Sequence, residues 1–139
     1  MAGQLTMPTD AVTAELRHWA REPFALGTGN CGLSVLGYAE RVREATVRRG
    51  RGLVGRRSAA RLMRSPERFV LVAAALMARL GCPETDAPLR GDVGLIDLPA
   101  GLTAAICLGD GDWAARGPRS TVIGPATAEI AWSVRCPQR

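Results

Sequence analysis

Apolar residues in the N-terminal half of the chain recur every three to four positions, which is the spacing of one face of an α-helix. A first helix is expected to begin at Thr9 or Asp10, both good capping residues, and to end near Arg21. A second helix is expected to begin at Cys31, with Asn30 as its cap. The cysteine would then lie in the first turn of a helix, directly after a glycine-containing loop.

The next part of the chain alternates between loop and helix signals. Glycine and arginine dominate the segment Arg48–Arg57, which predicts a basic loop, and Ser58–Arg64 is expected to be a short helix. The sequence Ser-Pro-Glu from Ser65 is a strong helix start, and Gly81 is a typical stop. Between them, Phe69–Leu80 carries a wide apolar stripe, so this helix is expected to contribute much of the core.

The pattern changes to short apolar runs separated by Gly, Pro and Asp in the C-terminal half. Strands are expected at Asp92–Asp97, Thr103–Leu108, Thr121–Ile123 and Ile130–Val134. Because helices come first and strands second, the predicted fold class is α+β, with N-terminal helices packed on a small antiparallel sheet. No repeat or composition shift divides the chain, so residues 1–139 are interpreted as one domain.

Composition and charge limit the classes of partner that are expected for the protein. The chain is 47% hydrophobic, but its longest apolar run is too short to span a membrane. The N-terminus has no signal-peptide pattern, so synthesis in a cytoplasm is expected. The net charge of +5 is concentrated between Glu40 and Arg68, where ten arginines and three glutamates give +7. Aromatic residues do not alternate with these arginines, which favours a charged protein partner over a nucleic acid. The candidate contact residues are Arg48, Arg49, Arg51, Arg56 and Arg57.

The four cysteines do not form a metal-binding pattern. Cys31, Cys82, Cys107 and Cys136 are widely spaced and the chain has a single histidine, so neither a zinc site nor another cofactor is predicted. In a reducing cytoplasm, disulfides are not expected either. The last three cysteines are interpreted as small buried apolar residues.

Three short segments, in this order along the chain, resemble motifs of the NlpC family of papain-like cysteine peptidases. They are Phe24–Cys31 (FALGTGNC), Arg90–Val93 (RGDV) and Thr103–Gly109 (TAAICLG). A fourth segment, Ala131–Val134 (AWSV), is similar to an NlpC-like family found in the tail-gene clusters of phages and gene transfer agents.

This resemblance implies a site as well as a fold. Cys31 occupies the position of the nucleophile, whose thiolate a helix N-terminus would stabilise. The position of the catalytic histidine falls on Thr103, whose hydroxyl is not a base near neutral pH. Thr103 and Cys107 share strand parity, so both are expected to face the second helix. A base would have to come from His18, from a carboxylate such as Asp92, or from another chain.

Two function hypotheses follow from the resemblance. The first is a structural component of a phage or gene-transfer-agent tail, near the tip or baseplate, built on a degenerate NlpC-like scaffold and located in the virion. The alternative is an active cysteine peptidase or amidase that cleaves peptidoglycan as the genome enters a cell, with Cys31 as nucleophile. DNA binding by the arginine-rich segment is a third, weaker option.

Overall fold

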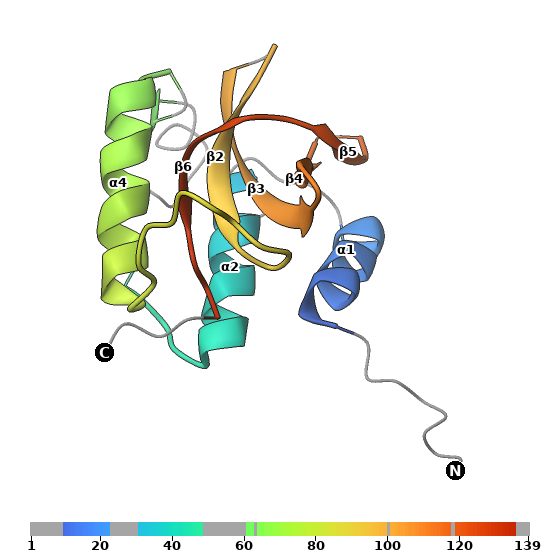
Figure 1. Ribbon diagram of the computed structural model, residues 1–139, viewed down its shortest axis with the longest axis horizontal. Helices are drawn as coiled ribbons and strands as arrows, with labels where there is room; N and C mark the ends of the chain where they lie inside the picture. The colour runs from blue at the N-terminus through green and yellow to red at the C-terminus, as the bar shows by residue number, and fades with distance from the viewer. Residues whose placement is uncertain are drawn as a thin grey trace.

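The fold of the protein is seen in a computed structural model that describes residues 10–22, 31–48, 61–62, 64–99, 101–117 and 119–135 (Figure 1). Among these residues, the order of elements begins with three named helices: α1 (Ala11–Arg21), α2 (Cys31–Arg43) and α4 (Pro66–Arg79). Five strands follow: β2 (Val93–Leu98), β3 (Gly101–Gly109), β4 (Asp112–Arg116), β5 (Thr121–Pro125) and β6 (Ala128–Trp132). The predicted α+β class, with helices packed on an antiparallel sheet, is confirmed.

Local capping explains where the helices begin. Asp10 caps α1 by accepting a hydrogen bond from the Thr13 N–H at 2.8 Å. Ser65 caps α4 in the same way through Arg68, and Gly81 follows the helix with a positive φ of 76°. The helix start at Cys31 is also confirmed, whereas its expected cap, Asn30, lies outside the described residues.

The sheet has the order β5-β4-β3-β2-β6, with every neighbouring pair antiparallel. All four expected strands are present, with small shifts of their ends. The fifth strand, β4, was not predicted, because its sequence DWAAR combines alanines with a charge at each end and lacks β-branched residues. Its position inside the sheet follows from long-range pairing with β3 and β5, which local propensity does not report.

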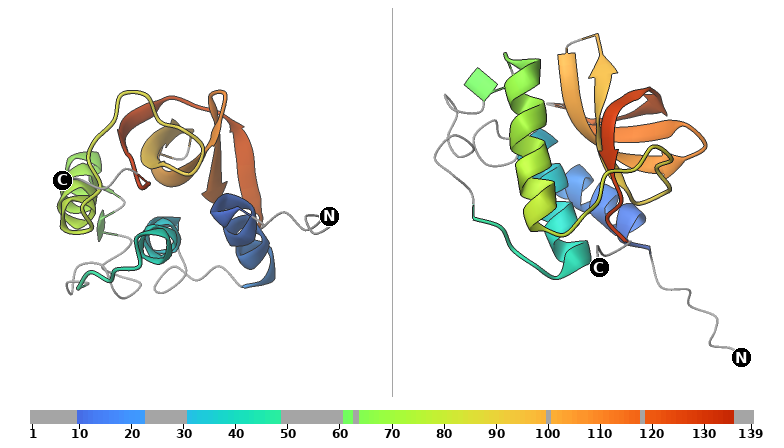
Figure 2. Two further views of the ribbon diagram at one scale, coloured as in Figure 1. Left: turned by 60° about the horizontal axis from the view of Figure 1, so that its bottom comes forward. Right: turned by 60° about the vertical axis from the view of Figure 1, so that its left-hand side comes forward.

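The sheet is strongly curled. Strands β5 and β6 lie at opposite edges, and a flat five-stranded sheet would hold those edges about 19 Å apart. The three Cα–Cα steps from Pro125 to Ala128 span at most about 11 Å. The edges must therefore approach each other, and the left view in Figure 2 shows the yellow-to-red strands forming an arch with the helices along one side.

Each face of the curled sheet carries its own apolar cluster. On the helix-facing side, Ala104 and Ile106 of β3 belong to a core with residues of all three helices, including Tyr38 and Phe69. The opposite face is buried inside the curl, where the residues are Ile96, Ala105, Cys107, Trp113, Ala115 and Ala131. Gly94 permits this arrangement, because a Cβ there would lie 2.9 Å from the Ile130 carbonyl oxygen and 3.0 Å from the Trp113 ring.

This assignment corrects one expectation. Cys107 is in the cluster inside the curl, and Thr103 shares its strand parity. The residues of β3 that face α2 are instead Ala104 and Ile106. The prediction that Thr103 and Cys107 face the second helix is therefore wrong.

Candidate functional site

Cys31 is the first residue of α2, at the helix end where backbone N–H groups lack helical partners. Cys31 is only 5% exposed. Burial raises the pKa of the Cys31 thiol above its ordinary value, and the N–H groups of Ala104, Gly32 and Cys31 itself oppose this only in part. A thiol in this environment stays protonated near neutral pH, whereas a nucleophilic cysteine needs its thiolate.

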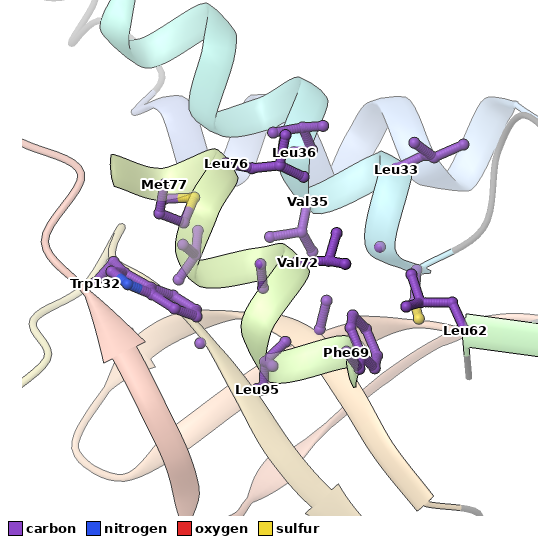
Figure 3. Close-up of a pocket in the computed structure, with 16 residues that line it drawn as sticks. Leu33, Val35, Leu36, Leu62, Phe69, Val72, Leu76, Met77, Leu95 and Trp132 are labelled. Carbon is purple, nitrogen blue, oxygen red and sulfur yellow. The ribbon is translucent and has the colours of Figure 1, made fainter. Parts of the chain in front are cut away.

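The surroundings of Cys31 are apolar. It lines a cavity of about 70 Å³ between α2, α4 and the sheet. In Figure 3, Trp132 and Met77 lie toward one end of this cavity, and Phe69 and Leu62 lie toward the other. Among the described residues that line it, none carries a carboxylate, an imidazole or a hydroxyl group. The cavity thus offers apolar contact and a single thiol, that of Cys31, but no carboxylate or imidazole that could take the proton of that thiol.

The structure does not bring the other predicted site residues to Cys31. Thr103 lies on the opposite face of β3 from Ala104, and its hydroxyl donates to the Gly101 carbonyl oxygen at 3.1 Å. His18 is exposed on α1 and is not among the residues that line the cavity. Where the resemblance placed a histidine opposite the nucleophile, the backbone of Ala104 is found.

Asp92, the other candidate base, makes structural contacts instead. It is 4% exposed, and its two carboxyl oxygens accept hydrogen bonds from the N–H groups of Leu89 at 2.8 Å and Val134 at 3.1 Å. Its backbone carbonyl accepts the N–H of Cys107 at 2.8 Å. The aspartate of the RGDV motif therefore holds the turn before β2 and the chain after β6 together, so its geometry does not favour a catalytic function.

The glycine of the same motif has a complementary function. Gly91 has a φ of +100°, and a Cβ there would lie 3.1 Å from Arg135 Nε and 3.3 Å from Tyr38 Oη. The Tyr38 hydroxyl donates to the Gly91 carbonyl oxygen at 2.7 Å, and this bond joins α2 to the turn. Burial raises the pKa of Tyr38 to about 12. The motif thus acts as a junction between the second helix, the sheet and the C-terminal segment.

Arg116 is a buried residue that the sequence interpretation missed. It extends from β4, is 7% exposed, and donates to Ser34 Oγ at 3.0 Å and to the Glu22 carbonyl oxygen. These bonds join the start of α2 to the end of α1. In the described part of the chain, no carboxylate forms an ion pair with Arg116. The only sequence signal was an arginine at the end of a short apolar run, which a surface strand end would also show.

The remaining cysteines and the arginine-rich segment are only partly described by the structure. Cys31, Cys82 and Cys107 are free and buried, and Cys136 lies outside the described residues. No group of three potential ligands that could hold a metal ion is found within the described ranges. Arg48 is exposed, whereas Arg49, Arg51, Arg56 and Arg57 lie outside the residues that the structure describes. None of the helices in those ranges is long and apolar enough to cross a membrane.

Together, the fold and the site define a small α+β domain with a buried cysteine at a helix start and apolar surroundings. The chain belongs to the family described as "Domain of unknown function (DUF6950)", which matches residues 6–134. No curated protein and no solved structure gives a significant match to it.

Proposed function

We propose that this protein is a non-catalytic structural subunit of a phage or gene-transfer-agent tail, near the tip or baseplate, built on a degenerate NlpC-like scaffold. The assignment to a tail rests on the Ala131–Val134 motif, which resembles an NlpC-like family of tail-gene clusters, together with the three earlier segments that resemble the NlpC family. The observation that supports a non-catalytic function is the environment of Cys31, whose sulfur is buried among apolar side chains.

The contacts of the motif residues support a scaffold function as well. Asp92 and Gly91 join three parts of the fold, and Thr103 lies away from the cysteine. A peptidase of this type needs a thiolate, a base that takes its proton and a group that orients the base. Among the described residues that line the cavity around Cys31, none supplies the base or the orienting group. The cysteine itself is present, but burial raises the pKa of its thiol and so favours the protonated form.

The location is tested on particles purified from a strain that encodes the protein. Mass spectrometry of particles separated on a density gradient is expected to detect this chain at a constant ratio to known tail proteins. A cytoplasmic protein that is absent from the particles would overturn the assignment to a tail.

The absence of catalysis is tested separately on purified peptidoglycan. The wild type and Cys31→Ala are expected to release no muropeptides, with an active NlpC-type peptidase as the positive control. Release by the wild type that Cys31→Ala abolishes would establish the alternative, an active peptidase or amidase. Equal release by both proteins would indicate catalysis that does not use Cys31.

A further inference from the structure

The two edges of the sheet differ. Along the outer edge of β6, the segment 83–85 forms a short additional ladder: the Ser133 N–H donates to the Pro83 carbonyl oxygen at 2.8 Å, and the Thr85 N–H donates to the Ala131 carbonyl oxygen at 2.9 Å. Strand β5 pairs only with β4, and no described residue forms a ladder along its other side. Within the described residues, one edge of the sheet is therefore covered by a further backbone segment, whereas the outer edge of β5 has no strand along it, although α1 also contacts β5.

The register of the β4–β5 pair shows which backbone groups are open. Hydrogen bonds join Gly117 to Ser120 at one end and Ala126 to Gly111 at the other, and bonded pairs alternate with non-bonded pairs between them. Val122 and Gly124 are thereby bonded to β4. The N–H and C=O groups of Thr121 and Ile123 point away from it, toward the open edge.

The side chains at this edge are unusual for an exposed strand. Val122 is 49% exposed and Ile123 is 58% exposed, and they are two of the four exposed large hydrophobic residues in the described part of the chain. A Cβ at Gly124 would meet no atom within 4 Å, so the face of β5 toward which it points is open there. Natural edge strands usually carry charges or irregularities that prevent pairing, and β5 (TVIGP) has no charged residue.

We infer that the open edge of β5 pairs with β5 of a second copy of this chain, in an antiparallel two-fold dimer. When the two β5 strands overlap fully, Ile123 lies at the two-fold axis and faces Ile123 of the other copy. Thr121 then lies opposite Pro125 of the other copy. Each Ile123 then exchanges both backbone hydrogen bonds with its copy. Each Thr121 N–H donates to the Pro125 carbonyl of the other copy. The missing N–H of Pro125 falls at the end of the ladder, where its loss matters least.

Charge complementarity is the reason to choose a second copy as the occupant. Arg119 is exposed just before the start of β5. The turn that contains Asp110 and Asp112 lies beside the other end of β5, because the Ala126 N–H donates to the carbonyl oxygen of Gly111 in that turn. Antiparallel pairing brings Arg119 of each copy toward the acidic turn of the other. The pairing is therefore self-complementary in charge, in a chain whose net charge of +5 would otherwise keep copies apart.

The first test is sedimentation equilibrium of the full chain from micromolar to millimolar concentration. The wild type is expected to dimerise with increasing concentration. Ile123→Pro removes the outward N–H without removing a bond to β4, and Ile123→Lys places a charge on the axis; both variants are expected to stay monomeric, with unchanged circular dichroism. Leu71→Lys changes another exposed aliphatic residue, which is 71% exposed on α4, and this variant is expected to dimerise like the wild type.

The second test reads the register directly by disulfide formation, with Cys136 replaced by serine throughout. Ile123→Cys is expected to cross-link, because residues opposite each other in a bonded pair have Cα atoms about 5.5 Å apart. Val122→Cys is the matched control. In the proposed register, residue 122 lies opposite residue 124 of the other copy, so the two introduced cysteines have Cα atoms more than about 7 Å apart, which is too far for a disulfide. A monomeric wild type, equal cross-linking by both variants, or dimers lost only in Leu71→Lys would overturn the inference. A wild type that stays monomeric but binds an extended peptide of another protein at β5 would assign the edge to that partner instead.

Discussion

The carboxyl group of Asp92 accepts a hydrogen bond from the backbone N–H of Val134, 42 residues further along the chain, at 3.1 Å. Its other oxygen accepts the N–H of Leu89 at 2.8 Å. The residue is thus a structural junction with two acceptor oxygens in use, buried where water cannot replace either bond.

Asp92→Asn is expected to destabilise the fold by about 1–3 kcal/mol, because one acceptor oxygen becomes an NH₂ group that faces a backbone N–H. Urea denaturation measures the change. Asp97→Asn is the matched control, since it makes the same chemical change at an exposed position of β2 and should alter stability by less than about 0.5 kcal/mol. If the two substitutions lowered the free energy of unfolding equally, the two hydrogen bonds of Asp92 would not stabilise the fold as inferred.

Gly94→Ala is expected to cost about 1–3 kcal/mol, because the new Cβ would lie 2.9 Å from the Ile130 carbonyl oxygen and would displace the Trp113 ring. Gly124→Ala is the control on another strand, where a Cβ meets no atom within 4 Å. Thermal denaturation followed by tryptophan fluorescence compares the two. A Gly94→Ala protein as stable as Gly124→Ala would show that the curl does not depend on this close contact.

Tyr38 is the only tyrosine in the chain, so its ionisation can be followed by the absorbance of tyrosinate. The folded protein is expected to titrate with a pKa of about 12, because burial disfavours the charged form. In denaturant, the transition should return to near the ordinary value of 10.0. A folded-state transition at that ordinary value would mean that the Tyr38 hydroxyl is exposed and its bond to Gly91 is not formed.

The ion pair between Asp10 and Arg90 joins α1 to the turn before β2, with Arg90 Nε 2.9 Å from the carboxylate. The hydrogen bond from Arg90, followed by that from the Thr13 N–H, holds the pKa of Asp10 well below its ordinary value of 3.8. Because the folded-state pKa is depressed, the stabilisation is present above 3.8 and is lost as the pH falls below it.

Asp10→Asn keeps a capping side chain but removes the charge. Its stability deficit relative to the wild type is expected to be below about 1 kcal/mol at neutral pH, because the pair is partly exposed, and to shrink as the solution is acidified. Chemical denaturation at neutral pH and at a pH below 3.8 provides the measurement. A deficit that grows on acidification would have the wrong sign for this ion pair.

Helix starts and the fold class could be predicted from the sequence because their causes are local. Asp10 and Ser65 cap helices within three residues of their own positions, and α4 shows its apolar stripe directly. The face of β3 could not be predicted in the same way. Its central residues, 104–107, are all buried, two against the helices and two inside the curl, so polarity does not alternate along the strand.

The candidate site shows the same division between local and distant causes. The place of Cys31 at the start of α2 is a local property, and it was predicted correctly. The burial of its sulfur depends on Phe69 and Leu62, which lie more than 30 residues away in the sequence, and on the strand β3. Likewise, nothing near Arg116 in the sequence indicates that its guanidinium reaches Ser34.

The reactivity of Cys31 distinguishes a nucleophile from a core residue. Because burial raises the pKa of its thiol, Cys31 is expected to react with iodoacetamide at neutral pH at least about tenfold more slowly than a free thiol. Mass spectrometry of labelled peptides gives the rate at each cysteine, with Cys82 and Cys107 as buried references whose thiol pKa values burial also raises. All three should react quickly once the protein is unfolded. If Cys31 in the folded protein were labelled much faster than the other two, its sulfur would be an accessible thiolate, and the helix start would again be a candidate for catalysis.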